Sequence, residues 1–232
     1  MEHITLGLLW FFVFLFSTVL HEAAHSWAAH KMGDSTAYEG GQVSLNPIPH
    51  IKRSPFGMVL VPLITFFSSG WMMGWASAPY DAHWAYRYPR KAGWMSLAGP
   101  GANLLLVLVA ALFIHIGLSF DVFMSPETVH ASMVVISTQP GMYSVPATFL
   151  SILFSLNLLL CFFNLLPFPP LDGSGAVTLL ITEKASEKYL EMIHHPQIQF
   201  VSFIVAWRLF DVIFDPIQTV ALNLLYSGAN YH

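Results

Sequence analysis

Long hydrophobic runs dominate the pattern of the chain, and polar residues gather in the segments between them. A membrane-spanning helix needs about 20 mostly apolar residues. Runs near that length lie at about 4–28, 56–78, 93–118, 146–167 and 198–225. A shorter apolar segment, 171–182, follows the sequence PFPPLDG. The pattern predicts an all-α polytopic membrane protein.

Composition points to the same class of protein. Hydrophobic residues make up 55% and charged residues 9% of the 232 residues, whereas a soluble domain carries about 25% charged residues. So few charges could not cover a soluble surface, and the lipid bilayer is the expected environment. The net charge of −4 gives no sign of a nucleic-acid partner. The single cysteine, Cys161, excludes an intramolecular disulfide and a cysteine zinc cluster.

We expect one membrane-embedded domain over residues 1–232, with a catalytic core at about 1–183 and a C-terminal span at about 198–225. The first run has no basic n-region and no small-residue cleavage site, so we expect a retained span instead of a signal peptide. The sequence makes no prediction of an oligomeric state.

The basic residues indicate which side of the membrane each connection faces. Eight of the nine Lys and Arg residues lie in three connecting segments: Lys31, Lys52, Arg53, Arg87, Arg90, Lys91, Lys184 and Lys188. The segment 119–145 and both termini have none. We therefore place the three basic segments in the cytosol, and 119–145 and both ends of the chain outside.

This orientation puts both ends of segment 56–78 in the cytosol, so the segment must enter and leave the membrane by the same face. Pro62 and Gly70 in its interior suit a broken path. Such backbone is tolerated at membrane depth only where it is buried in protein or faces water. We expect a re-entrant segment and about four full spans; the alternative is a plain span with the basic residues of 87–91 outside.

The stretch YEGGQVSLNP, residues 38–47, predicts a small β element at the cytosolic membrane edge. Paired glycines precede alternating Val43 and Leu45, a pattern typical of a short strand or hairpin. A substrate could add as a strand to this edge near 41–46. A polar loop is the alternative interpretation.

The first hydrophobic run ends in HEAAH, residues 21–25. On a helix, residues four apart lie on one face, with about 5–6 Å between Cβ atoms, so His21 and His25 can bind one metal ion. Glu22 beside them can act as general base on a water molecule at the metal, which is the spacing of zinc hydrolases. The motif also occurs by chance, but ionisable residues inside spans are rare and functional by default.

A catalytic zinc site has three protein ligands and keeps a fourth position for water. The stretch NLLPFPPLDG offers Asp172 as the third ligand. Its prolines break a helix and can turn Asp172 inward. The alternative role for Asp172 is a helix N-cap, which it could combine with metal binding.

These two motifs, in this order and in a membrane context, resemble the site-2 protease family of intramembrane zinc metalloproteases. The stretches GGQVSLNPIPHI (40–51), GWASAP (74–79) and SLAGPGANLLL (96–106) fit as well, and the likeness covers about residues 15–180. Within the family, these stretches resemble the compact prokaryotic branch that lacks PDZ and CBS domains. One departure is Lys52-Arg53, where members of this branch often have an acidic residue.

The resemblance implies one Zn²⁺ per chain, bound by His21, His25 and Asp172, with Glu22 activating the water. It also implies that Asn164 positions the substrate or stabilises the developing oxyanion. It places Asn103 where the family has a polar residue near the site, and Asn164 or Asn103 could donate a hydrogen bond to the oxyanion.

The function implied by the resemblance is regulated intramembrane proteolysis. The protein would be an endopeptidase whose partner is a transmembrane helix of a substrate protein, in a prokaryotic plasma membrane, with the active site open to the cytosol. Two other functions fit parts of the pattern. A catalytically silent relative would bind membrane helices as a scaffold, although it would have no need of Glu22. A metal transporter would need access from both sides, and the outer segment offers few ligands.

Overall fold

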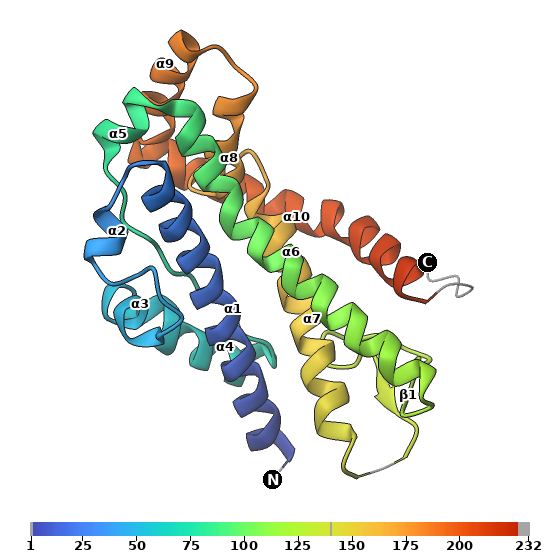
Figure 1. Ribbon diagram of the computed structural model, residues 1–232. Coiled ribbons are helices and arrows are strands. Elements are labelled where there is room, and N and C mark those ends of the chain that lie inside the picture. The colour runs from blue at the N-terminus through green and yellow to red at the C-terminus, as the bar shows by residue number, and fades with distance from the viewer. Residues whose placement is uncertain (1, 140, 227–232) are drawn as a thin grey trace.

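The computed structural model describes residues 2–139 and 141–226, and helices form most of it (Figure 1). The long helices are α1 (Glu2–Met32), α6 (Pro89–Ser119), α7 (Ser144–Asn164) and α10 (Pro196–Leu225). The shorter helical elements are α2 (Thr36–Glu39), α3 (Pro47–Arg53), the π-helix η1 (Phe56–Leu60), α4 (Val61–Ser69), α5 (Ala82–Arg87), α8 (Asp172–Ala176), the 3₁₀ helix η2 (Val177–Leu179) and α9 (Glu183–Ile193). Two short strands, β1 (Phe123–Met124) and β2 (Ile136–Ser137), pair antiparallel.

Three helices in the described part of the chain are long and apolar enough to cross a membrane: His3–Met32, Pro89–Ser119 and Ser144–Asn164. They confirm the prediction of a mostly helical membrane protein. The last predicted run forms α10, whose described apolar stretch, Val212–Leu225, is shorter than a span. The polar connection before α10 contains the helix α9, which was not predicted.

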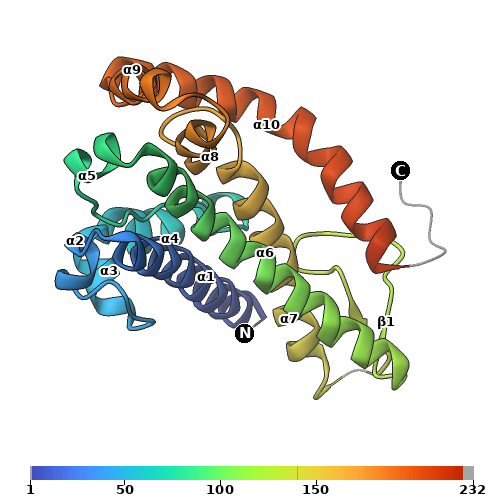
Figure 2. The same ribbon diagram turned by 45° about the horizontal axis from the view of Figure 1, so that its top comes forward.

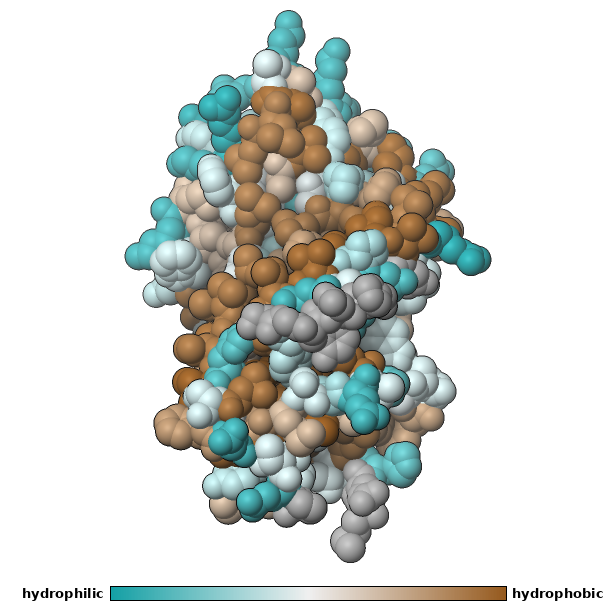
Figure 3. Space-filling model, turned by 90° about the vertical axis from the view of Figure 1, so that its right-hand side faces the viewer, coloured by the Kyte–Doolittle hydropathy of each residue, from teal (hydrophilic) through white to brown (hydrophobic). Residues whose placement is uncertain are grey.

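The core lies where α6 packs between α1 and α7 (Figures 1 and 2). Val13, Phe14, Ala110, Ile114 and Ile152 are its most buried members, each at most 1% exposed. The outer faces of the same helices are also apolar, because helices that contact both protein and lipid are hydrophobic all round. Figure 3 views the side on which α10 lies in Figure 1, and hydrophobic surface extends over its upper and middle parts as well.

Residues 56–80 form a hairpin with one helical and one extended limb. Gly70 takes the left-handed conformation (φ 79°) and ends α4, after which the chain returns without regular secondary structure. The Trp75 N–H donates to Gly57 O (3.1 Å), and the Met73 N–H donates to Thr65 Oγ1 (2.9 Å). The two limbs therefore lie against each other, with Trp75 beside Gly57 near the start of the helical limb.

The predicted β element at 38–47 is wrong. Thr36–Glu39 is helical, and the Asn46 side chain accepts a hydrogen bond from the Ile48 N–H (3.0 Å) to cap α3. Val43 and Leu45 do alternate, but within the described residues no strand lies beside them, and a strand needs a neighbouring backbone to pair with. The described strands β1 and β2 lie instead between α6 and α7.

Polar contacts fix the loops at the end of α1. The buried carboxylate of Asp34 accepts hydrogen bonds from the Thr36 N–H (2.9 Å) and hydroxyl (2.6 Å), and from the Asp81 N–H (2.8 Å). Burial alone would raise the pKa of Asp34, but these bonds hold it below its ordinary value. Lys91 Nζ donates to Met32 O (3.0 Å). The end of α1 is thereby joined to α5 and α6.

We expect Gly74→Ala to destabilise the hairpin. An added Cβ would lie 2.8 Å from Pro62 Cγ and against Phe14 and the Gly57 carbonyl. Overpacking of this kind costs about 1–3 kcal/mol. The thermal midpoint of the detergent-solubilised protein should fall. Gly40→Ala is the control, because its Cβ would make only ordinary contacts at 3.5 Å and beyond; equal midpoints in the two variants would contradict the prediction.

Candidate metal centre

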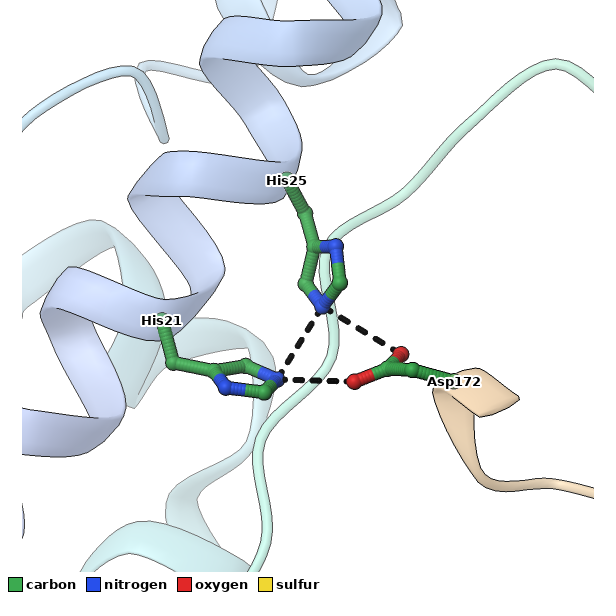
Figure 4. Close-up of side chains that lie close together, drawn as sticks. All are labelled: His21, His25 and Asp172. Atoms are coloured by element: carbon green, nitrogen blue, oxygen red, sulfur yellow. Dashed lines mark hydrogen bonds and ion pairs between the residues drawn. The ribbon is translucent and has the colours of Figure 1, made fainter. Parts of the chain in front are cut away.

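Three side chains from two distant segments converge at one point (Figure 4). His21 and His25 lie one turn apart on α1, and Asp172 is the first residue of α8. The two Nε2 atoms are 3.0 Å apart. Asp172 Oδ2 lies 3.1 Å from His21 Nε2, and Oδ1 lies 3.2 Å from His25 Nε2. The structure therefore brings together the three predicted ligands, with ligand atoms all within 4.8 Å of one another.

Hydrogen bonds on the far side of each imidazole ring set its orientation. His21 Nδ1 lies 2.5 Å from Asn103 Oδ1, and His25 Nδ1 lies 2.7 Å from Met95 O. Both partner atoms are amide oxygens, which only accept, so each Nδ1 carries the hydrogen and donates it. Each Nε2 is then unprotonated, with its lone pair toward the other ligands. Metal-binding histidines have this arrangement.

The donor set fits a cation. With both hydrogens on Nδ1, neither Nε2 can donate to the other ring or to the carboxylate. Asp172 Oδ2 is buried and has no hydrogen-bond donor, and leaving such a group unsatisfied costs about 1–3 kcal/mol. Zinc with bonds of about 2.0–2.1 Å holds neighbouring ligand atoms roughly 3.3 Å apart. The separations of 3.0 to 3.2 Å here are close to that value.

Gly99 allows α6 to pass directly against the two histidines. A Cβ at this residue would lie 2.6 Å from both Cε1 and Nε2 of His21, and closer still to His25 Nε2. Real Cβ atoms essentially never come within 3.0 Å of such neighbours. A larger residue at position 99 would therefore displace the ligand atoms or move the helix.

A chain of buried polar groups continues behind His21 across three helices. Asn103 Nδ2 donates to Asn157 Oδ1 (2.8 Å), and Asn157 Nδ2 donates to Ser17 Oγ (2.9 Å) and to Leu153 O (2.8 Å). Both asparagines are fully buried. Asn157 was not predicted. The sequence feature that could have identified it is its position as a polar residue in the middle of a hydrophobic run, because a polar side chain buried there without partners is costly.

The proline-rich loop 165–171 turns α8 toward α6, as its prolines predicted. Close approach between these helices depends on small residues, since a Cβ at Gly175 would clash with Ser96, and one at Gly93 would lie 2.8 Å from Leu179 Cγ. Asp172 is the first residue of α8 and makes no capping hydrogen bond. The N-cap alternative for Asp172 is therefore not observed.

A cavity of about 310 Å³ opens beside the ligands, lined by Glu22, His25 and Asp172 among others. Glu22 thus lines the same cavity as His25 and Asp172, and its role as general base stays a prediction. One turn further along α1, the buried hydroxyl of Ser26 also lines the cavity and has no hydrogen-bond partner. Ser26 was not predicted, although its spacing of four residues from Glu22 places both on one face of the helix.

The structure does not bring Asn164 or Asn103 into this cavity. Asn164 Nδ2 donates to Leu160 O (2.9 Å) on its own helix, and neither asparagine is among the residues that line the cavity. Asn103 lies behind the His21 ring, where its oxygen and nitrogen both have partners. The contact of Asn164 with a substrate stays a prediction.

A family model described as "Peptidase family M50" matches residues 9–207, which include all three ligands and Glu22. The chain belongs to peptidase family M50. This membership confirms the resemblance to the site-2 proteases, and with the three apolar helices it indicates a membrane metalloprotease.

Two relatives agree with the M50 assignment. The chain is 31% identical over 220 residues to "Putative zinc metalloprotease YwhC" of Bacillus subtilis (strain 168). The matched region covers 87% of this chain and 90% of that protein. The chain is also 30% identical over 163 residues to "Putative zinc metalloprotease Rip2" of Mycolicibacterium smegmatis (strain ATCC 700084 / mc(2)155), covering 70% of this chain and 53% of that protein. No solved structure matches the chain.

We expect Gly99→Ala to lose most of its zinc, because the added methyl group occupies the space beside the two Nε2 atoms. Metal analysis of detergent-purified protein should find near one zinc per chain in the wild type and a small fraction of that in the variant. Gly101→Ala, two residues along the same helix and with open space around its Cβ, should keep full zinc. Full zinc in Gly99→Ala would show that the ligands lie elsewhere.

Asn103→Leu should weaken zinc binding by about 10–100-fold, because it removes the acceptor that orients His21. Competition with a chelator of known affinity measures the change. Asn164→Leu serves as the matched control, since its side chain contacts α7 and not a ligand. The same affinity in both variants would mean that the Asn103 contact does not support the metal site.

Proposed function

We propose that this M50 protein is an intramembrane zinc endopeptidase that cleaves transmembrane segments of other membrane proteins. The observation that carries the proposal is the position of the catalytic groups within a candidate span. By the helical rise of 1.5 Å per residue, His25 and His21 lie roughly 10 and 16 Å inside the end of α1 at Met32. A peptide bond must therefore be brought to membrane depth to be cleaved.

The proposed topology has four spans, α1, α6, α7 and α10, and a re-entrant hairpin at 56–80. The helical limb Phe56–Ser69 rises roughly 20 Å, less than the roughly 30 Å hydrocarbon core. Trp75 on the returning limb lies beside Gly57 near the start of the helical limb, which supports entry and exit by one face. Lys31, Lys91 and Lys184 lie in segments at the α5–α9 end of the molecule, and the positive-inside rule puts this end in the cytosol of a prokaryotic cell.

His21, His25 and Asp172 would hold the zinc ion. When bound, zinc supplies a Lewis acid and a water molecule whose pKa is lowered toward 7. Glu22 accepts the proton of the attacking water and then donates it to the leaving amide nitrogen. Asn103 keeps the His21 ring in the correct tautomer. Asn164 would contact the substrate only after its side chain leaves the Leu160 carbonyl.

The extended limb of the hairpin gives a better place for strand addition than residues 41–46, which form no strand. Residues Ala76, Ser77 and Ala78 line the cavity beside Glu22. An unwound substrate that pairs with this limb would present its carbonyl groups to the metal centre, with affinity from main-chain hydrogen bonds.

Glu22→Gln should abolish cleavage while zinc stays near one per chain, because the amide cannot accept a proton. Removal of a general base lowers the rate by about 10²–10⁴-fold. The assay uses the protein in liposomes with a library of transmembrane peptides whose central residues are randomised, and mass spectrometry detects the products. Asp172→Ala should lose both zinc and cleavage, and Glu39→Gln, at an exposed site, should lose neither.

Two outcomes would contradict the proposal. Full cleavage by Glu22→Gln would remove Glu22 from the mechanism. Zinc binding without cleavage by the wild type, together with retention of the peptides, would favour a helix-binding scaffold.

A further inference from the structure

The cavity beside the metal centre continues toward the cytosolic end of the molecule, between α5 and α9. We propose that this part, here called the α5–α9 pocket, is a subsite that takes a large apolar side chain of the substrate next to the cleaved bond. It is lined by Ala29, Ala85, Ala92, Met95, Leu190 and Ile193. The inference rests on the proposed endopeptidase function and adds its side-chain specificity.

Three alanines from three helices create the space of the α5–α9 pocket. Ala29 lies one turn beyond His25 on α1, Ala85 lies on α5, and Ala92 lies on α6, and all three belong to one apolar cluster. A dry apolar cavity of about 150 Å³ holds a benzene molecule. The whole cavity of about 310 Å³ therefore has room for a phenyl-sized side chain as well as the adjoining backbone.

Helix α9 closes the cytosolic end of the pocket. Its N-cap is Thr182, and Leu190 and Ile193 face inward with at most 6% of their surface exposed. Two contacts hold α9 in place: Tyr189 Oη donates to Ser174 O (2.9 Å), and Tyr80 Oη lies 2.8 Å from His194 Nε2. A pocket with a closed end has a fixed depth, so it discriminates between side chains by size. α5, α8 and α9 gather at this end of the molecule in Figures 1 and 2.

Polar residues line the cavity along its length, and beside α9 and α10 they are Tyr80, His194 and Gln199, of which Tyr80 and His194 contact each other at 2.8 Å. Glu22, Asp172 and the unpartnered hydroxyl of Ser26 are at the metal end, where the peptide backbone must lie for cleavage. The six residues of the α5–α9 pocket carry no charge and no side-chain hydrogen-bonding group. Burying a polar side chain there without a partner would be unfavourable. The pocket therefore selects an aromatic or a large aliphatic side chain.

Ala85→Leu tests the proposal by filling the pocket. The same randomised peptide library in liposomes is used, and the ends of the products are sequenced by mass spectrometry. Wild-type products should carry Phe, Leu or Met at one fixed position beside the cleaved bond. Ala85→Leu should lower the ratio of cleavage with Phe to cleavage with Ala at that position by roughly tenfold or more.

Ala82→Leu is the matched control, because Ala82 lies on the same helix, is exposed and does not line the cavity. It should keep the wild-type preference. Leu190→Ala enlarges the pocket and should shift the preference the opposite way, from Leu toward Trp. If Ala85→Leu does not fold, as judged by zinc content and gel filtration, Leu190→Ala alone decides.

The possible results separate the two proposals. Cleavage by the wild type without a side-chain preference would overturn the subsite and leave the endopeptidase function standing. An unchanged preference in folded Ala85→Leu or in Leu190→Ala would do the same. No cleavage of any library member by the wild type would overturn the proposed function, and the subsite with it.

Discussion

The contact between His21 Nδ1 and Asn103 Oδ1 is the interaction on which the metal centre depends. It sets the tautomer of His21, and with the Met95 carbonyl behind His25 it leaves two Nε2 lone pairs facing one carboxylate. Asn103 is in turn held by Asn157, which reaches Ser17 on α1. The ring of this candidate ligand is thus connected to all three packed helices, and a shift of any one of them would move it.

The hydrogen-bonded series Asn103, Asn157 and Ser17 also explains how an apolar helix bundle can hold polar and charged side chains. Buried polar groups are costly in a membrane protein unless every donor and acceptor has a partner. The two buried asparagines meet that requirement through each other, through Ser17 and through the backbone. Among the buried polar atoms that have no hydrogen-bond partner in the described residues, Asp172 Oδ2 and the Ser26 hydroxyl belong to residues that line the cavity, where a cation and a substrate would supply the missing partners.

The short segments around the bundle lie at the α5–α9 end of the molecule and surround the same centre. The hairpin at 56–80 supplies the extended limb along the cavity, α8 carries Asp172, and α9 covers the end. None of them is long enough to form a stable unit alone. They are positioned by close contacts at glycines such as Gly93 and Gly175 and by the Asp34 and Lys91 hydrogen bonds. The lining of the cavity therefore comes in part from elements separate from the long helices.

Local information was sufficient for the features that depend on periodicity and spacing. The hydrophobic runs predicted the helices α1, α6, α7 and α10, and within the described residues the first three are long and apolar enough to cross a membrane. HEAAH put two histidines on one helical face, and the prolines before Asp172 predicted a turn there. The β element at 38–47 failed because a strand depends on a partner that the segment's own residues do not encode.

Only the tertiary structure decided which distant groups meet. The chain by itself does not reveal that Asn157 supports Asn103, that Gly99 makes room for two ligands, or that Asn164 points away from the cavity. Each of these facts depends on how α1, α6 and α7 are rotated against one another. That rotation results from the packing of many side chains at once, and no single motif in the sequence specifies it.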